Sequence, residues 1–362
     1  MSDLATTAQL YSARPVVRIG GLEDPALGDA LLSLAVEETT DGLYSLEACF
    51  GNWGSVDGSI DYLYFDRAVF DFGAELELEL GEGDAAGTVF RGRISALEGR
   101  FPLERPPELQ VLAEDRLQDL RMTRRTRSFE EVSDTDVFET IAADHGLTTE
   151  LDLDGPTYPV LAQVNQSDLA FLRERARTAD AEVWVEGDTL HAQARARRES
   201  ATLTLTYGQR LRELSVCADI AHQRTLVAVA GWDVGAKEAI VEEAEESVLG
   251  NELGAGTSGP SILRDAFAER EEQLVHCVPL SVDEAASLAR AHYRRLARRF
   301  LVGHGVAEGD ARLRAGTHVE LAELGPLFAG SYYVTRVKHT FDSRGGYRTH
   351  FCVERPALGG SS

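Results

Sequence analysis

The chain has 362 residues, more than one ordinary compact core accommodates, so two to four domains are expected. Its 60 acidic and 36 basic residues give a formal net charge of −24. This charge argues against a groove for a nucleic-acid backbone and against an anionic membrane surface, because both require positive charge on the protein. Solubility is the simplest explanation of the acidity. The alternative is that some acids line a lumen or a contact between subunits.

The sequence shows no sign of a membrane protein or of a secreted, disulfide-rich protein. No apolar run reaches the ~20 residues of a bilayer span, and Met1 to Leu10 lack the basic and apolar regions of a secretory signal. The cysteines are far apart in the sequence: Cys49, Cys217, Cys277 and Cys352. His276 beside Cys277 is a poor chelate, because adjacent residues of a strand point to opposite faces. We expect buried, reduced thiols, with no disulfide framework and no metal site.

Residues 1–115 have the pattern of a small antiparallel β-barrel or sandwich. Leu31 to Glu38 and Leu43 to Phe50 are two strand-like runs, and the Asp41-Gly42 pair between them indicates a hairpin. The run from Glu75 to Leu80 alternates glutamate and leucine, so a strand places the acids on one face and the leucines on the other. Val89 to Leu97 and Leu109 to Ala113 complete the set of strands. We predict a first barrel over 1–115.

Residues 116–200 predict a small α+β domain. Ser133 opens a helix with a pattern resembling a capping box, and Gly146 ends it in the left-handed conformation. Ser167 or Asp168 caps a second helix, and a hairpin turning at Gly187-Asp188 follows. A basic cluster precedes the first helix: Arg121, Arg124, Arg125 and Arg127. Local ion pairs and a contact with an acidic neighbouring subunit explain this cluster equally well.

The remaining chain returns to β structure with an interruption. Strands are expected at Thr202 to Tyr207 and at Thr225 to Gly231, and again over residues 317–355. Between them lie a Gly- and Ser-rich loop and a long helix that Ser281 caps and Gly303 ends. We predict a discontinuous second barrel over 201–235 and 303–356. Residues 236–302 form a loop and helical insertion, and 357–362 a tail.

No pattern of catalytic residues is found. The sequence contains no nucleophile elbow, phosphate-binding loop, zinc-binding helix motif or dinucleotide fingerprint. His145 lies at a helix end, where a positive charge is favoured, and the other histidines in strands are expected to pack or to face solvent: His191, His318, His339 and His350. Paired acids are uninformative in so acidic a chain. We therefore expect no enzyme, no catalytic, cofactor-binding or metal-binding residues, and no cofactor.

Four stretches in order resemble a known family. The end of the chain, from Tyr333 to Asp342 and then Gly346 to Arg355, resembles the closing segment of the phage late control protein D family, which is related to VgrG. Gln163 to Leu172 is similar to a helix entry of that family, and Glu182 to Leu190 to the hairpin after it. Gly231-Trp232-Asp233 with Lys237 to Ile240 resembles its segment leaving the second barrel. Together the matches cover residues 120 to 355, about two-thirds of the chain.

The resemblance implies a fold and an assembly. The fold is mainly β with α+β insertions: two tube-type antiparallel barrels plus two smaller domains. Three copies form a ring of pseudo-six-fold symmetry. The implied function is the structural baseplate hub of a contractile, phage-tail-like injection system, which adapts a trimeric spike to the hexameric tail tube. Glu75, Glu77 and Glu79 then face the channel or a neighbouring barrel.

The resemblance also sets the expected partners. They are two further copies of the chain, a tail tube ring, baseplate wedge proteins and a trimeric spike. VgrG proteins continue into a needle beyond the hub, whereas this sequence ends at Ser362, so we expect a separate spike protein. Assembly is expected in the bacterial cytoplasm as part of a phage tail or tail-like particle, with an extracellular location after particle release left open. The alternatives are a spike-associated cell-wall hydrolase and an effector-carrying secreted module.

Overall fold

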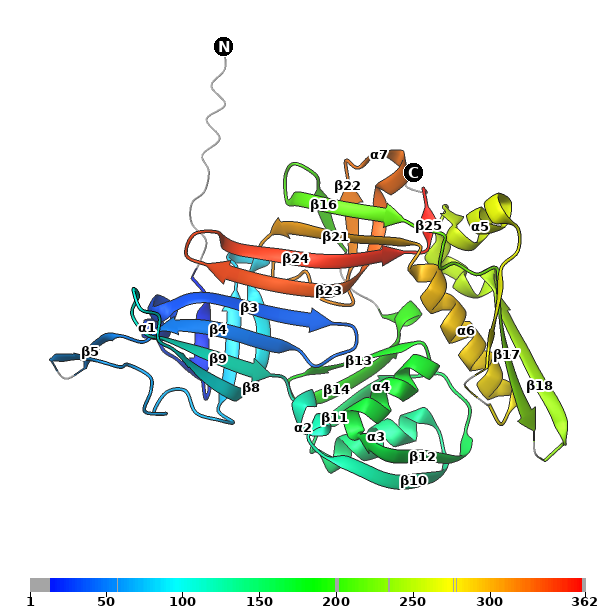
Figure 1. Cartoon of the computed structure of the whole chain (residues 1–362), viewed down its shortest axis with the longest axis horizontal. Helices are drawn as coiled ribbons and strands as arrows, with labels where there is room; N and C mark the ends of the chain where they lie inside the picture. The colour runs from blue at the N-terminus through cyan, green and yellow to red at the C-terminus, as the bar shows by residue number, and fades with distance from the viewer. Residues whose placement is uncertain are drawn as a thin grey trace, which may run out of the picture.

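The computed structural model describes residues 14–359, except residues 57, 199–201, 234, 276 and 278. The start of the chain, His276 of the His276–Cys277 pair and the end of the tail fall outside this part. The described residues form a mainly β fold with four hydrophobic cores. In Figure 1 two β modules form a curved layer, an α+β domain lies below it, and a further insertion lies at the right. Within the described residues, no helix has the length and apolar character that a membrane crossing requires.

The first β module surrounds one core and agrees with the predicted strand pattern. Its strands are β1 (Val16–Ile19), β2 (Leu22–Glu23), β3 (Leu31–Thr39), β4 (Ser45–Gly51), β7 (Glu75–Leu80), β8 (Gly87–Arg100) and β9 (Glu108–Glu114). In β7 the three leucines are buried and the glutamates are exposed or half-buried, as the alternation predicts. The short helix α1 (Pro25–Ala30), the turn η1 (Gly83–Ala85) and the hairpin β5 (Gly54–Val56) with β6 (Ser59–Asp61) lie between these strands.

The second β module surrounds a separate core. Its strands are β15 (Leu203–Thr206), β16 (Leu211–Ala218), β21 (Leu301–Glu308), β22 (His318–Ala322), β23 (Gly330–Asp342) and β24 (Gly346–Arg355). The short elements α7 (Gly325–Phe328) and β25 (Ala357–Leu358) complete it. The sequence pattern did not indicate β16, which forms one end of the sheet.

The two modules join into one sheet of thirteen strands, a continuity that the sequence did not predict. Its order is β16-β21-β24-β23-β3-β4-β9-β8-β7-β1-β2, with β22 and β15 continuing from β23. The junction is the antiparallel pair of β3 and β23, whose register runs from Thr39 opposite Arg336 to Ser33 opposite Asp342. Closure of each module into a barrel stays a prediction.

The modules repeat one topology. In chain order, the strands β1, β3, β4, β7, β8 and β9 correspond to β15, β16, β21, β22, β23 and β24, because each set follows the same path of neighbours through the sheet. One direction differs, since β1 is antiparallel to β7 whereas β15 is parallel to β22.

A shared irregularity fixes the correspondence residue by residue. The register of β8 against β9 shifts between Ile94 and Ala96, and that of β23 against β24 shifts between Val334 and Arg336. The skipped residues are Ser95 and Thr335. Each donates its hydroxyl at 3.4 Å to the carbonyl oxygen of the strand opposite, of Leu112 and Cys352 respectively. β-Bulges of this kind bend a strand where its pairing changes.

The α+β domain has its own core. It contains α2 (Leu117–Arg121), β10 (Arg124–Val132), α3 (Asp134–Asp144), β11 (Thr148–Asp152), β12 (Tyr158–Ser167), α4 (Asp168–Thr178), β13 (Ala181–Glu186), β14 (Thr189–Ala194) and η2 (Arg195–Arg197). Ser133 and Asp136 form the predicted capping box, Ser167 caps α4, and Gly146 has a φ of 65° after α3. The hairpin at Gly187-Asp188 joins β13 to β14 as expected.

The insertion is larger than predicted and contains its own sheet. Its elements are β17 (Leu226–Asp233), β18 (Glu238–Glu245), η3 (Glu246–Leu253), β19 (Thr257–Ser258), α5 (Gly259–Phe267), β20 (Glu271–Leu274) and α6 (Val282–Arg298). The prediction that Thr225 to Gly231 belong to the second barrel is wrong, because β17 pairs with β18 and β20 and not with the long sheet. Val227 and Val229 pack with Ala289 and Tyr293 of α6. The alternating pattern predicted a strand but carried no information about its neighbours.

Candidate interaction surface

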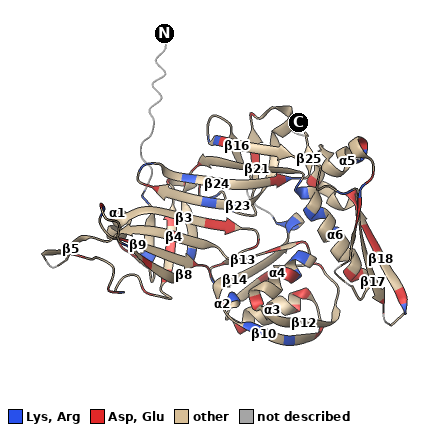
Figure 2. Ribbon diagram, viewed as in Figure 1, with Lys and Arg blue, Asp and Glu red and all other residues tan. Residues whose placement is uncertain are grey.

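The long sheet presents a polar face that continues across both modules. One row of directly opposed residues follows this face from β16 to β7: Glu213, Val306, His350, Lys338, Glu37, Ser45, Glu114, Arg93 and Glu75. Acids and bases alternate along part of this row, an arrangement that stabilises cross-strand pairs. Figure 2 shows charges of both signs on the sheet, whereas β18 is predominantly acidic.

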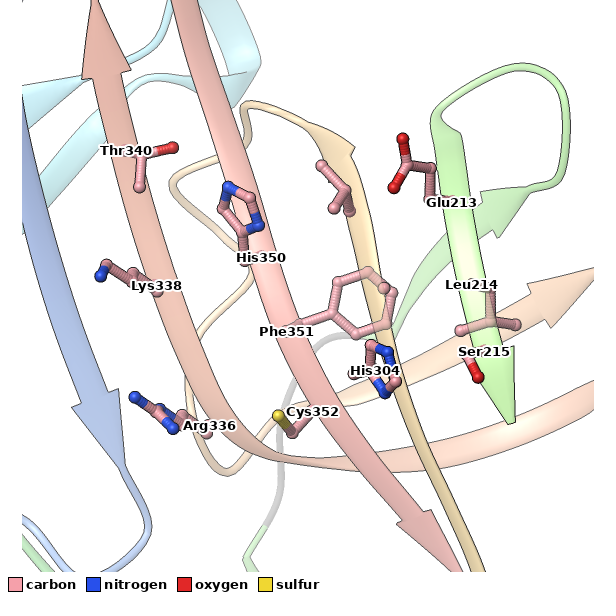
Figure 3. Close-up of a pocket in the computed structure, with 12 residues that line it drawn as sticks. Glu213, Leu214, Ser215, His304, Arg336, Lys338, Thr340, His350, Phe351 and Cys352 are labelled. Atoms are coloured by element: carbon pink, nitrogen blue, oxygen red, sulfur yellow. The ribbon is translucent and has the colours of Figure 1, made fainter. Parts of the chain in front are cut away.

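A groove of about 550 Å³ hollows this face over β16, β21, β24 and β23. Figure 3 shows His304, Arg336, Lys338, His350 and Cys352 around it, with Glu213 and Ser215 on the β16 side. Arg336 is paired with Glu37 at 2.7 Å, while Lys338 forms no ion pair with the described part of the chain. Partial burial and then the charge of Lys338 lower the pKa of His350. The imidazole is therefore biased towards its neutral form. The groove thus offers the hydrogen-bonding groups of its histidines and the positive charge of Lys338.

The three glutamates of β7 lie on the polar face and have partners in their own chain. Arg18 of β1 lies 3.0 Å from Glu77 and 3.2 Å from Glu79, and Arg91 of β8 lies 2.6 Å from Glu75. Half-exposed pairs of this kind contribute little to stability. What they give this end of the sheet is a surface of three acidic and two basic side chains.

A buried ion-pair cluster holds the insertion against the α+β domain. Arg298 of α6 is 2% exposed and donates to Asp180 at 2.5 Å and to Glu252 of η3 at 2.7 Å. Burial lowers the pKa of Arg298, but the bonds to Glu252 and the charge of Asp180 outweigh burial and raise it overall. Arg294, one turn earlier, lies 3.3 Å from Asp180. Three segments distant in sequence are thus held by one guanidinium.

Two further clusters join the β modules to their neighbours. Glu182 of β13 accepts from Tyr333 of β23 at 2.5 Å and from Arg198 at 2.7 Å. Glu38 of β3 is fully buried and its Oε1 lies 2.5 Å from Nε of Arg314, an ion pair whose angle is not that of a linear hydrogen bond. These contacts connect the long sheet to the α+β domain and the first β module to the second.

Asp115 connects the first β module to the α+β domain. Its carboxylate accepts from the backbone N–H of Tyr44 at 2.7 Å and of Leu117 at 2.9 Å. Burial raises the pKa of Asp115 to about 7, although the two backbone bonds oppose this. The folded state therefore binds this proton more tightly than the unfolded chain, whose carboxyl has a pKa of about 3.9. The stability that this protonated carboxyl contributes to the fold is full below pH ~4 and is lost as pH rises towards 7.

Asp115→Asn tests this pH dependence. The wild type is expected to lose roughly 3 kcal/mol relative to the variant between pH 5 and pH 8. At low pH the variant should be less stable than the wild type by roughly 1–3 kcal/mol. The reason is that the side-chain NH2 of the new asparagine faces one of the two backbone N–H groups, which then has no acceptor. Urea unfolding across this pH range measures both effects. The exposed Asp265→Asn is the matched control, and an Asp115→Asn difference that stays constant with pH would contradict the assignment.

An aromatic cluster lies exposed beside β8. The ring centroids of Trp53 and Tyr62 are 5.2 Å apart, those of Tyr62 and Phe65 5.0 Å, and those of Phe65 and Phe101 5.5 Å. Phe101 is 65% exposed. Aromatic rings that gather at a surface in this way are typical of protein–protein contacts. The β5–β6 hairpin projects from this region at the left of Figure 1.

The predicted basic cluster is largely paired with residues of its own chain. Arg121 bonds Glu114, Arg124 bonds the carbonyl of Asn165, and Arg125 and Arg127 both contact Asp144 and Asp168. His145 also bonds Asp168, at 2.8 Å. The described residues thus show local pairing at this cluster and at His145, while a contact with an acidic neighbouring subunit stays a hypothesis.

The cysteines differ in part from the prediction. Those at 49, 217, 277 and 352 are all free, as expected, but Cys217 is exposed on β16 and only Cys49 is buried. Cys217 lies on the outer edge strand, which the sequence pattern did not indicate. Among the described residues, no three His, Cys, Asp or Glu side chains are grouped so that they could hold a metal ion.

Sequence reasoning missed most of the residues that define this surface. Lys338 and His350 lie in strands that were predicted, but the sequence did not indicate that they border one groove with β16 and β21. Phe101 and Tyr62 are separated by 39 positions, and only the fold brings them together. A cluster of aromatic residues over 62–72 is the one sequence signal that could have identified this patch.

The fold matches solved tail proteins over nearly the whole chain. The 43 kDa tail protein of prophage MuSo2 from Shewanella oneidensis is 11% identical, with a TM-score of 0.70 and coverage of 95% of this chain and 99% of that one. A tail protein of Neisseria meningitidis MC58 is 13% identical, with a TM-score of 0.69 and coverage of 95% and 97%. An E. coli component of the type VI secretion system is 13% identical, with a TM-score of 0.58 and coverage of 94% and 76%. At these identities the similarity establishes a shared fold.

No curated protein matches the sequence. A family model described as the Alg8 N-terminal domain matches residues 55–343, a range that includes strands of both β modules, the α+β domain and the insertion. The chain therefore belongs to the family of the Alg8 N-terminal domain.

Proposed function

We propose that the protein is a non-catalytic structural hub in the baseplate of a contractile, phage-tail-like injection system. The observation that carries this proposal is the repeated β module, two per chain and joined edge to edge in one sheet. Three copies supply six such modules, so that a three-fold spike can meet a six-fold tube. The fold shared with phage tail proteins and a type VI secretion component supports this role, as does the resemblance of the last strands to late control protein D and VgrG.

In this proposal the continuous polar face lines the channel. The apolar residues of both modules lie on the opposite side of the sheet, in their two cores. Water-exposed residues of mixed charge suit a wall along which other components pass. The partners proposed are a trimeric spike, a tube ring and baseplate wedge proteins. Assembly takes place in the bacterial cytoplasm, as part of a tail or tail-like particle.

Reversing the three glutamates of β7 tests the channel role. With Glu75, Glu77 and Glu79 all changed to Lys, particle assembly is expected to fall sharply, because the wall or contact then has the wrong charge. Electron microscopy of particles from a strain carrying the variant measures this. Unchanged trimerisation together with unchanged particle assembly would contradict the role.

A charge-swapped variant separates this effect from misfolding. Adding Arg18→Glu and Arg91→Glu to the three lysines restores the pairs within the chain but keeps the acidic positions reversed. If this variant regains stability and still fails to assemble particles, the charge is recognised by a partner. Release of soluble fragments from purified cell wall by the wild-type protein would instead favour a hydrolase.

A further inference from the structure

The long sheet has two unpaired strand edges. β16 pairs with β21 on one side; on the other, the described residues contribute only an isolated bridge between Tyr207 and Leu211. The second half of β8 pairs with β9 on one side. On its other side, the residues that the structure describes bond it only as far as Ile94, whose backbone N–H and C=O bond Ala74 and Gly73. Exposed edges of this length invite pairing with another strand unless they are covered.

The chain itself shows how two such edges fit. Within one copy, β3 pairs with residues 336–342 of β23. By the topological repeat, β16 is the counterpart of β3 and β8 is the counterpart of β23. The aligned bulges at Ser95 and Thr335 make 96–102 the counterpart of 336–342. The edges left free are therefore the counterparts of the two edges that are joined inside the chain.

We propose that β16 of one copy pairs antiparallel with residues 96–102 of a second copy, in the register of the internal β3–β23 junction. Transferring that register through the repeat gives the opposed pairs: Ala218 with Leu97, Cys217 with Glu98, Val216 with Gly99, Ser215 with Arg100, and Leu214 with Phe101.

The side chains at the two edges suit this pairing. Leu214 and Val216 pack against the second core from the edge strand and are half-buried, so a neighbour can complete their burial. Phe101 and Phe65 lie over Gly99, within 3.1 Å and 3.3 Å of where a Cβ would stand. These two rings, of which Phe101 is exposed, therefore lie on the face that would cover Leu214. On the polar face, Arg100 lies diagonally opposite Glu213, within reach of a cross-strand ion pair.

The contact is heterologous, because each copy uses a different edge on each side. Contacts of this kind close into rings when the rotation between copies allows it. A closed ring then alternates internal and intermolecular junctions of the same geometry. The number of copies rests on the proposed function, whereas the pairing of the edges rests on the repeat and the free strands.

The native Cys217 allows a direct test by cross-linking. In Glu98→Cys, the two opposed residues of neighbouring copies have Cα atoms about 4.5–5.5 Å apart, a separation that suits a disulfide. Mild oxidation is expected to move the 39.5 kDa band on a non-reducing gel to two and three times that mass, and reduction to restore it. The variant Glu98→Cys with Cys217→Ser removes the link. Glu47→Cys, exposed at the centre of β4, should form none with Cys217.

The outcome separates this proposal from the hub proposal. Sedimentation of the same samples gives the number of copies without oxidation. Trimers that do not cross-link at positions 98 and 217 would overturn the register and leave the hub in place. Single copies at all concentrations would overturn both. Cross-linked trimers support both.

A substitution at the aromatic edge provides a second measurement. Phe101→Glu is expected to raise the concentration at which half of the trimer dissociates by about 30-fold, because a charge would enter an apolar contact. The fold should be unaffected, since Phe101 is 65% exposed in the single chain. Phe267→Glu, at the 58% exposed end of α5, is the matched control and should leave dissociation unchanged. Equal behaviour of the two variants would contradict the proposed contact.

Discussion

Arg298→Met is expected to destabilise the protein by about 3–5 kcal/mol. The substitution leaves Asp180 and Glu252 close together with their shared guanidinium removed, and uncompensated buried charge is costly. Urea unfolding followed by circular dichroism measures the loss. Hydrogen exchange should also rise in α6 and in the sheet of β17, β18 and β20, because the cluster ties this insertion to the rest of the molecule.

Two further variants make this prediction specific. Arg290→Met changes an exposed arginine on the same helix and is expected to cost under about 1 kcal/mol. Adding Asp180→Asn and Glu252→Gln to Arg298→Met should recover part of the loss, since the unpaired charges are then removed. Equal, small effects of Arg298→Met and Arg290→Met would show that the cluster does not hold the insertion.

His339 is expected to make the protein sensitive to acid. Its ring is fully buried between the modules, with Nδ1 2.8 Å from the Tyr347 hydroxyl and 3.3 Å from that of Thr349. Burial and the nearby positive charge of Arg314 lower the pKa of His339 to about 3, while Asp310 and a backbone bond act in the opposite direction. The unfolded chain has a pKa of about 6.5 at this residue. The stability that the neutral His339 ring contributes to the fold is thus intact above pH 6.5 and is lost as pH falls towards 3.

His339→Leu removes this titration. The variant should be less stable than the wild type at pH 7 by roughly 1–2 kcal/mol, since the Tyr347 hydroxyl loses a partner. On lowering the pH from 6.5 to 4.5, the wild type should lose roughly 2 kcal/mol relative to the variant. Asp115 acts in the opposite direction over part of this range, so the variant and the wild type must be compared at each pH. His304→Leu, on the polar face, is the control. A difference between His339→Leu and wild type that does not change with pH would contradict the assignment.

Local pattern predicted most of the elements. The alternation over Glu75 to Leu80, the cap at Ser133 and the turn at Gly187-Asp188 are decided by neighbouring residues, and each is confirmed. Pairing between distant strands is not decided in this way. Thr225 to Gly231 has the composition of a buried strand, and only the packing of α6 against it determines that it belongs to the insertion.

The repeat between the modules could not be found in the sequence for a related reason. What the modules share is the order of their strands and the position of a bulge, and these leave little trace in the side chains. Ser95 and Thr335 are alike, but the residues that follow them are not: Ala96 corresponds to Arg336 and Glu98 to Lys338. Opposed edges and the exposed rings of Tyr62 and Phe101 became candidates for an interface only once the fold placed them.

The most direct test of the hub is the mass and symmetry of the purified protein. Sedimentation combined with electron cryo-microscopy should give a ring of three copies, with six β modules around a central channel lined by the polar face of the sheet. Single copies across the whole concentration range, or a closed assembly with the polar face on its outside, would contradict it.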